Sequence, residues 1–142
     1  MKRTSTAVWH GSGKEGTGTI TSQSKKLDNA FYAWNTRYED ERGTNPEELI
    51  AAAHAGCFTM KLSFILTAAG YPPDEIITTS TVTLEESTIA QSHLVVKAKV
   101  PAIQKDLFLE CAERSKNECP VSKALNLKIT MQVEVEIPVK VL

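Results

Sequence analysis

Three cysteines, Cys57, Cys111 and Cys119, are the residues of this 142-residue chain best suited to covalent chemistry. The thiolate form of cysteine is a nucleophile and a metal ligand, whereas a buried neutral thiol is inert. In an intracellular setting, three cysteines are structural, metal-binding or redox-catalytic rather than a disulfide framework. What each sulfur does therefore depends on whether its surroundings favour ionisation.

Cys111 and Cys119 have contrasting surroundings. Cys111 follows Leu107 by four residues on the apolar stripe of an amphipathic segment, which favours a core residue. Cys119 immediately precedes Pro120, a typical first residue of a helix, and the free N–H groups of a helix start stabilise a thiolate. Glu118 opposes this ionisation by like-charge repulsion. Cys119 is therefore a redox candidate, with an ordinary loop thiol as the alternative.

Cys57 lies in the stretch GTNPEELIAAAHAGCFTM, residues 43–60, in the middle of a predicted apolar helix. Burial among apolar side chains raises the pKa of a thiol, so this setting alone favours a core residue. A reactive Cys57 needs a cation from another segment, and arginine is the best candidate because it stays charged when desolvated. Arg37 and Arg42, upstream of the helix, are the candidates.

Other chemistries receive less support. His54, Cys57 and Cys119 would be three ligands for zinc, but a fourth ligand and the usual paired ligand spacings are missing. A hydrogen-bonded interior position is the favoured reading of His54. The chain has no G-x-S-x-G, Walker A or dinucleotide-binding motif, so hydrolase and nucleotide-dependent functions gain no support.

The segment around residue 57 is predicted to be one long helix. Asn45 suits the capping position, Pro46 suits the first turn, and the helix should run to about Ala69, where Gly70 ends it. A second, amphipathic helix is expected from Ile103 to about Lys116, and a short one begins at Pro120. Residues 27–38 are expected to be extended or looped.

Alternating apolar and polar residues predict strands around these helices. The expected strands are Thr6–His10, Thr17–Ser22, Ile76–Leu84, Ile89–Val100 and a last one from 128 to the end of the chain. This order indicates an α+β fold with a mainly antiparallel sheet, in a single domain spanning residues 1–142. Three nearby aromatic residues either wall an apolar pocket or pack at an interface: Phe31, Tyr32 and Trp34. Trp9 is expected to face the core.

Composition limits the partners. The net charge is −1 and basic residues do not cluster, so neither a nucleic-acid partner nor a membrane surface is expected. The N-terminus lacks the apolar segment of a signal peptide, and a cytoplasmic location is expected. The apolar run from Leu49 to Ala69 contains His54 and Lys61, which favours a central buried helix over a membrane span.

Several motifs in this order resemble the OsmC/Ohr family of thiol-dependent hydroperoxidases, and specifically its osmotically inducible (OsmC) branch. The matching segments are AVWHG at 7–11, GTG at 16–18, NTRYE at 35–39, GTNPEELIAAAHAGCF at 43–58 and CPVSKAL at 119–125. The resemblance covers nearly the whole chain. It implies an OsmC-like fold with mainly antiparallel sheets around long central helices, assembled as an intertwined homodimer.

The resemblance also implies residue roles. Cys57 matches the peroxidatic cysteine, Cys119 the resolving cysteine, Arg37 the arginine of the site and Glu47 the glutamate that orients it. Cys111 matches no family cysteine, and Glu118 stands where relatives carry a small residue. The implied activity is the reduction of organic hydroperoxides, and less well of hydrogen peroxide, in oxidative or osmotic stress defence. No cofactor is implied beyond an external dithiol or lipoyl-type reductant.

Helix geometry adds one inference about the assembly. Glu47 and Cys57 are ten residues apart, hence about 15 Å along one helix and roughly 80° apart around it. An arginine held by Glu47 can hardly reach Cys57 of the same chain, so the arginine and glutamate are expected to come from a partner subunit. Two alternatives remain: a redox-sensing or binding module that turns over poorly, and a protein whose thiols are all buried filler.

Overall fold

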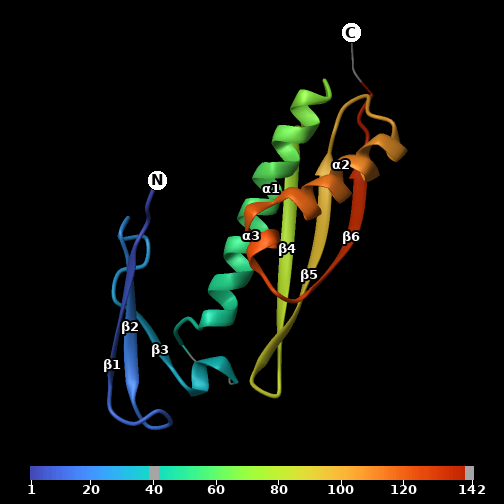
Figure 1. The fold of residues 1–142 in the computed structure, drawn as a ribbon. Coiled ribbons are helices and arrows are strands. Elements are labelled where there is room, and N and C mark those ends of the chain that lie inside the picture. Colours follow the sequence, from blue (N-terminus) through green and yellow to red (C-terminus); the bar gives the residue numbers. More distant parts are fainter. Residues whose placement is uncertain (39–41, 140–142) are drawn as a thin grey trace. The chain divides into compact units, whose positions relative to one another are not determined.

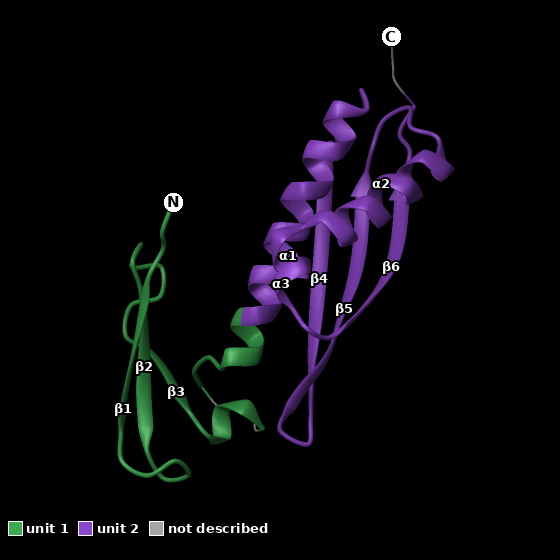
Figure 2. Ribbon diagram, viewed as in Figure 1, with its two compact units in different colours: residues 1–49 green, residues 50–142 purple. Residues whose placement is uncertain are grey.

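The computed structural model describes residues 1–38 and 42–139, which form two compact units, residues 1–49 and residues 50–142 (Figure 2). The fifth residue of the NTRYE motif, Glu39, and the last three residues of the chain lie outside the described part. The single domain expected from the length stays a prediction. Each unit is described by itself below, with elements labelled as in Figure 1.

The first unit contains an antiparallel sheet in the order β1-β2-β3. Its elements are β1 (Ser5–His10), β2 (Thr17–Ser22), β3 (Ala30–Ala33) and the short 3-10 helix η1 (Asn35–Arg37). Gly18 in β2 pairs with Trp9 on one side and Tyr32 on the other. A Cβ atom at Gly18 would lie 2.7 Å from both aromatic rings, so only glycine lets the rings meet, with centroids 5.3 Å apart.

The long helix α1 (Pro46–Ala68) begins in the first unit and continues through the second. The Asn45 side chain accepts a hydrogen bond from the Glu48 N–H at 2.8 Å, which is an N-cap of the expected kind. At the other end Gly70 has a φ of 90°, and the Tyr71 N–H donates to the Leu66 carbonyl at 2.9 Å. Both predicted ends of this helix are confirmed.

The second unit is built on the sheet β4-β5-β6. Strands β4 (Glu75–Glu85) and β5 (Thr88–Lys99) form the expected hairpin, whose two turn residues, Glu86 and Ser87, have φ values of 46° and 65°. The chain then passes through α2 (Lys105–Glu118) and α3 (Pro120–Ala124) to β6 (Lys128–Glu136). Because this connection is a helical crossover, β6 runs parallel to β5.

The sheet of the second unit differs from the predicted one in two respects. The β5–β6 pairing is parallel, although the other three pairings are antiparallel and the fold is α+β as expected. The last strand ends at Glu136 and does not continue to the end of the chain. Pro138 has no N–H to donate to a neighbouring strand, so pairing cannot continue through it. Residues 140–142 lie outside the described part.

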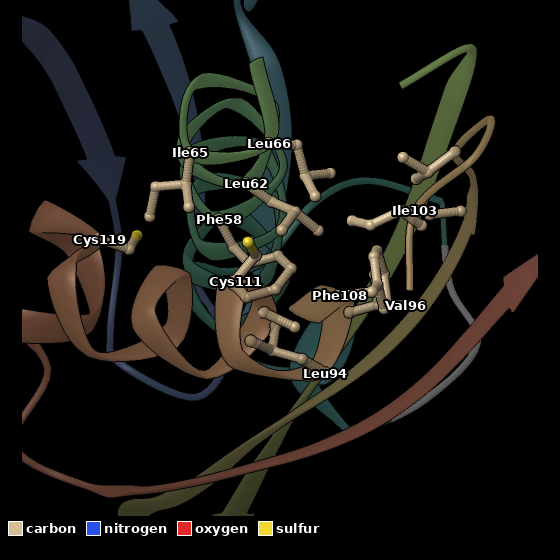
Figure 3. Packing of buried hydrophobic residues seen from close by; sticks show 13 residues of the cluster. Phe58, Leu62, Ile65, Leu66, Leu94, Val96, Ile103, Phe108, Cys111 and Cys119 are labelled. Carbon is tan, nitrogen blue, oxygen red and sulfur yellow. The ribbon is translucent and has the colours of Figure 1, made fainter. Parts of the chain in front are cut away.

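The hydrophobic core of the second unit lies between the helices and one face of the sheet (Figure 3). It contains Phe58, Leu62, Ile65 and Leu66 of α1, Leu94, Val96 and Ala98 of β5, Val100, Ile103, Phe108, Cys111, Ala112 and Cys119. Truncating Phe58 to alanine would destabilise the fold by about 3–5 kcal/mol, since it is fully buried. This core fixes α1 and α2 and thereby the segments that carry the cysteines.

Helix α1 is long and apolar enough to cross a bilayer by length and composition. In this structure its residues Phe58, Leu62 and Leu66 are fully buried against the second sheet and α2. Other apolar side chains on the same helix remain exposed, including Met60 and Phe64. The helix is therefore only partly covered within one chain.

Candidate active site

Two of the three cysteines come together in the second unit. Cys57 lies half-buried in the middle of α1, and Cys119 lies fully buried between the last residue of α2 and Pro120, the first residue of α3. Each thiol is among the groups that shift the pKa of the other, so the two side chains lie against each other. All three cysteines are free thiols. The fold therefore brings together two cysteines that are far apart in the sequence, and the disulfide between them stays a prediction.

The surroundings of Cys119 favour its ionised form. Burial opposes ionisation, but hydrogen bonding from the Cys57 thiol, from the backbone N–H and hydroxyl of Ser122 and from the Val121 N–H lowers the pKa of Cys119. The sulfur makes no regular capping hydrogen bond, yet the first turn of α3 faces it with these donors. The thiolate expected at this helix start is therefore supported.

The surroundings of Cys57 act in the opposite direction. Burial is the main cause that raises the pKa of the Cys57 thiol, and its hydrogen bond to Cys119 raises the pKa further. The Val121 N–H and the positive charge of Lys61 lower it, without reversing the shift. Within the second unit the surroundings thus raise the pKa of Cys57 and lower that of Cys119, and burial acts on Cys57 as its apolar position in α1 predicts.

Arg37 and Glu47 form an ion pair in the first unit. The Arg37 Nε lies 3.0 Å from Glu47 Oε1 and donates a hydrogen bond to Glu47 Oε2 at 3.2 Å. Glu47 is nearly buried, whereas about a third of the Arg37 side chain is exposed. Both carboxylate oxygens contact one nitrogen, so the two terminal nitrogens of the guanidinium take no part in this pair. The other candidate arginine, Arg42, lies exposed in a bend.

The segment that carries Arg37 is held by buried hydrogen bonds. The Thr36 hydroxyl donates to the carbonyls of Ala33 at 2.7 Å and Thr44 at 2.9 Å, and the Asn45 side-chain amide donates to the Thr36 carbonyl at 2.9 Å. Thr36 thereby ties η1 to the residues just before α1. This bracing positions Arg37 opposite the first turn of α1, where Glu47 lies.

A pocket of about 140 Å³ adjoins Arg37 within the first unit. Its lining residues are Trp9, Gly13, Tyr32, Ala33, Trp34, Arg37 and Pro46. The pocket interpretation of the aromatic cluster is thus supported for Tyr32 and Trp34, while Phe31 is not part of the lining. Trp9 is half-buried and lines this pocket, although we expected it to face the core.

The charge of Glu118 is compensated by two cations. Its carboxylate lies 3.4 Å from Lys61 Nζ of α1 and 3.3 Å from Arg114 Nε of α2. Desolvation alone would raise the pKa of Glu118. The hydrogen bond and attraction from Arg114, followed by those from Lys61, outweigh it and lower the pKa of Glu118. The repulsion that the sequence predicts between Glu118 and a thiolate at Cys119 is therefore offset by these cations.

His54 and Cys111 occupy the interior positions that were favoured for them. His54 is fully buried, and both of its ring nitrogens are hydrogen-bonded, Nδ1 to Ser92 Oγ at 2.6 Å and Nε2 to Ser122 Oγ at 2.8 Å. Cys111 is buried in the core, and burial raises the pKa of its thiol (Figure 3). No group of three side chains suited to hold a metal ion occurs in residues 1–38 and 42–139.

Sequence reasoning missed two residues of this site. Lys61 follows Cys57 by four residues on α1, a spacing that places both on one helical face. Ser122 follows Cys119 by three residues, which is the spacing of an N-cap and the third helical position. Both spacings can be read from the sequence. The spacing of Cys119 and Ser122 does not by itself show that Ser122 contacts a histidine on another helix.

Comparison with known proteins identifies the family of this chain. The family model described as OsmC-like protein matches residues 39–134. Peroxiredoxin OsmC of Escherichia coli (strain K12) is 41% identical over 134 residues, covering 92% of this chain and 94% of that protein. Organic hydroperoxide resistance protein OhrB of Bacillus subtilis (strain 168) is 29% identical, covering 84% and 89% of the two chains.

Solved structures share the fold. An OsmC-like protein from Mycoplasma pneumoniae superimposes with a TM-score of 0.75 at 14% identity, covering 95% of this chain and 97% of that chain. The crystal structure of OhrB from Bacillus subtilis gives a TM-score of 0.62 at 24% identity, covering 94% and 98%. With the family model and the relatives above, these matches show that the chain belongs to the OsmC-like protein family.

Proposed function

We propose that this protein is a thiol-dependent peroxidase that reduces organic hydroperoxides to alcohols. The observation that carries the proposal is the pair of free thiols Cys57 and Cys119, which come together in the second unit and shift each other's pKa. The family relatives named as a peroxiredoxin and as organic hydroperoxide resistance proteins support the same chemistry. A role in oxidative or osmotic stress defence follows from this activity.

In the first step, the Cys57 thiolate attacks the distal oxygen of the hydroperoxide. The O–O bond breaks, its electron pair leaves with the alkoxide, and the alkoxide takes up the proton that Cys57 gave up, which yields an alcohol and Cys57 sulfenic acid. The sulfur loses two electrons to the peroxide.

In the second step, Cys119 attacks the sulfenic sulfur of Cys57. A sulfur–sulfur bond forms, the sulfur–oxygen bond breaks, and the leaving hydroxide takes up a proton to become water. An external dithiol then reduces the disulfide by thiol–disulfide exchange and becomes a disulfide itself. A dithiol or lipoyl-type reductant is the partner that this cycle requires, and no bound cofactor takes part.

Arg37 and Glu47 are proposed to ionise Cys57 from a second copy of the chain. Burial raises the pKa of Cys57 in its own unit, so a fixed guanidinium near the sulfur is needed to make it a nucleophile at neutral pH. Glu47 holds the guanidinium through Nε, which leaves the terminal nitrogens to face the thiolate and the peroxide oxygens. Helix geometry makes this an interaction between subunits, as argued from the spacing of Glu47 and Cys57.

The exposed apolar surface of α1 supports a homodimer. Ala53, Gly56, Met60 and Phe64 follow one another at helical spacing, and all four are exposed. Met60 is 62% exposed and Phe64 69% exposed, values that are costly for large apolar side chains in water. A second copy of α1 is the proposed occupant, because an antiparallel pair buries both stripes and brings each Cys57 toward the other chain's helix start.

The pocket beside Arg37 supports an organic substrate. Aromatic rings of Trp9, Tyr32 and Trp34 form most of its apolar wall, while Arg37 supplies the charge at its edge. An alkyl or aryl group gains from burial there, whereas hydrogen peroxide has no such group, so hydrogen peroxide should be a poorer substrate. We propose a cytoplasmic enzyme without nucleic-acid or membrane partners, in keeping with its near-zero net charge.

Steady-state turnover tests the proposed function. Purified protein with dithiothreitol should consume cumene hydroperoxide, and Cys57→Ser should abolish consumption. Cys111→Ser is the matched control, because it changes a buried cysteine of the core that has no role in the proposed reaction. Retained activity in Cys57→Ser would overturn the assignment of the nucleophile.

One observation favours a second function, that of a redox sensor. In its own unit burial raises the pKa of Cys57, which slows the first step unless Arg37 arrives from a partner. A sensor would be oxidised once to a Cys57–Cys119 disulfide and would not be turned over by several dithiols. Multiple turnovers with any dithiol exclude this second function.

A further inference from the structure

His54 forms two buried hydrogen bonds that the proposed reaction does not use. Its Nδ1 lies 2.6 Å from Ser92 Oγ on β5, and its Nε2 lies 2.8 Å from Ser122 Oγ on α3. His54 and Ser92 are completely buried, and Ser122 is nearly so. A neutral imidazole donates through one nitrogen and accepts through the other, so the two serines satisfy both ring nitrogens. One side chain of α1 thus binds both the sheet and the short helix α3.

The hydrogen bond between His54 and Ser122 lies close to the redox pair along both of the segments that it joins. His54 precedes Cys57 by three residues on α1, so the two side chains share one helical face. Ser122 follows Cys119 by three residues, within the first turn of α3. The bond therefore connects the two segments that carry the sulfurs, about one helical turn from each sulfur.

Backbone hydrogen bonds fix Cys119 along its own segment. Its N–H donates to the Ser115 carbonyl at 3.0 Å, and its carbonyl accepts from the Lys123 N–H at 3.0 Å. These bonds hold the residue to α2 and α3, whereas its position relative to α1 depends on contacts between side chains. Apolar packing in the core is not directional, so a directional hydrogen bond from α1 is better suited to orient this segment.

Another contact between α1 and this region is more exposed. Lys61 Nζ lies 3.4 Å from the Glu118 carboxylate at the end of α2, with 33% and 41% of the two side chains exposed. Such an ion pair contributes little, because water screens the charges and both side chains lose freedom. Loss of the bond from His54 costs more, because it leaves a buried polar group without a partner. Of these two contacts, the histidine holds α3 more firmly.

We propose that His54 is a positioning residue, which holds α3 against α1 so that Cys119 lies within reach of the Cys57 sulfenic acid. This inference rests on the proposed function, because it assigns a residue to its second step. In that step the Cys119 sulfur bonds to the Cys57 sulfur, the sulfur–oxygen bond breaks, and the leaving hydroxide takes up a proton to become water. His54 contributes by restricting the geometry, which raises the rate of a reaction within one molecule.

Two substitutions of His54 separate positioning from packing. Asparagine places its amide near the Nδ1 position and glutamine near the Nε2 position, so His54→Asn reaches only Ser92, whereas His54→Gln reaches Ser122. A single equivalent of cumene hydroperoxide is added to each reduced full-length protein, and the alcohol, dimedone-reactive sulfenic acid and disulfide are followed by rapid quenching. The alcohol burst should match wild type in both variants. Disulfide formation should slow about threefold to tenfold in His54→Asn and stay close to wild type in His54→Gln.

Thr59→Val is the matched control for these variants. Thr59 also lies on α1, two residues from Cys57, but its Oγ1 lies 2.7 Å from Thr78 Oγ1 and so joins the helix to β4. Its disulfide should form as fast as in wild type. If wild type gives no alcohol, the proposed function fails. If wild type gives alcohol and disulfide, only the positioning role fails when His54→Asn is equally fast, or when His54→Gln or Thr59→Val is equally slowed.

The second test uses no hydroperoxide. Proton NMR of reduced wild-type protein should show a nuclear Overhauser contact between the His54 ring and the β protons of Ser122. The equilibrium constant of the Cys57–Cys119 disulfide against dithiothreitol should shift toward the dithiol by about threefold to tenfold in His54→Asn, since the sulfurs are held together less well. Absence of the ring contact in wild type, or an unchanged equilibrium constant in the variant, would overturn the positioning role.

Discussion

Cys57 in the middle of one long helix lies against Cys119 at the start of a five-residue helix, and each thiol shifts the pKa of the other. The two positions differ in electrostatics as well as in sequence. Burial dominates at Cys57 and raises its pKa, whereas donors from α3 overcome burial at Cys119 and lower its pKa. A single chain thus prepares the resolving sulfur for ionisation better than the proposed nucleophile.

Removal of the proposed guanidinium should impair the first chemical step. We expect Arg37→Met to reduce kcat/KM for cumene hydroperoxide by about 10²–10³-fold, the usual effect of losing a donor that stabilises transition-state charge. Glu47→Gln should cause a smaller loss, since the arginine remains but loses its ionic partner. Stopped-flow kinetics of hydroperoxide reduction measures both. Arg42→Met is the control and should resemble wild type; an equal loss in that variant would contradict the role of Arg37.

Disruption of the exposed stripe on α1 should dissociate the proposed dimer and remove activity with it. Phe64→Glu places a charge at a side chain that is 69% exposed in one chain, so the fold of the second unit should survive while association is lost. Sedimentation velocity and turnover measure the two effects. Leu109→Glu changes an exposed apolar residue of α2 that is 39% exposed and serves as the control. An active monomer of Phe64→Glu would contradict a site shared between subunits.

Neutralising Glu118 should affect the resolving thiol little, because Lys61 and Arg114 already offset its charge. We expect Glu118→Gln to change the rate of disulfide formation by less than roughly threefold, the modest effect typical of exposed ion pairs. Lys61→Met should have the larger effect, since it removes the cation that lowers the pKa of Cys57. Rapid-quench measurement of both half-reactions distinguishes these outcomes. A large acceleration in Glu118→Gln would show that its repulsion is not compensated.

The same ion pairs predict a pH window for stability. The pKa of Glu118 is lowered in the folded protein, so its contribution is present above the ordinary carboxyl pKa and is lost as pH falls through the folded value. Thermal unfolding midpoints of wild type and Glu118→Gln should therefore converge in acid and at high salt. Glu110→Gln changes an exposed residue on the same helix and should show no such convergence.

His54 predicts a second boundary, in the same direction but at higher pH. Burial lowers the pKa of His54 below the ordinary value of 6.5, so the unfolded chain binds a proton there before the folded chain does. Stability should be complete above about pH 6.5 and decline as pH falls below it. Urea unfolding of wild type and His54→Gln between neutral and mildly acidic pH checks this, because the variant lacks the pH-dependent contribution of His54 to the free energy of unfolding. Parallel pH profiles for the two proteins would contradict it.

Local sequence signals predicted most elements because their causes are local. Asn45 and Gly70 bound α1 through a cap and a left-handed turn, and both effects depend on a few neighbouring residues. Alternation located the hairpin of β4 and β5, which needs only the turn at Glu86 and Ser87. The parallel pairing of β6 was not predictable, since it depends on where the α2–α3 crossover returns the chain.

For the candidate site, too, one part could be predicted from the sequence and another part depends on the tertiary structure. Residue types and motif order alone determined which sulfurs and which arginine are candidates. The chemistry of a thiol or a guanidinium is a property of the side chain, and the order and spacing of NPEEL, CF and CPVS can be read directly from the sequence. Only the tertiary structure decided that Cys119 lies against Cys57, that Lys61 and Arg114 offset Glu118, and that Ser122 contacts His54. Ionisation depends on distances between residues far apart in sequence, and packing sets those distances.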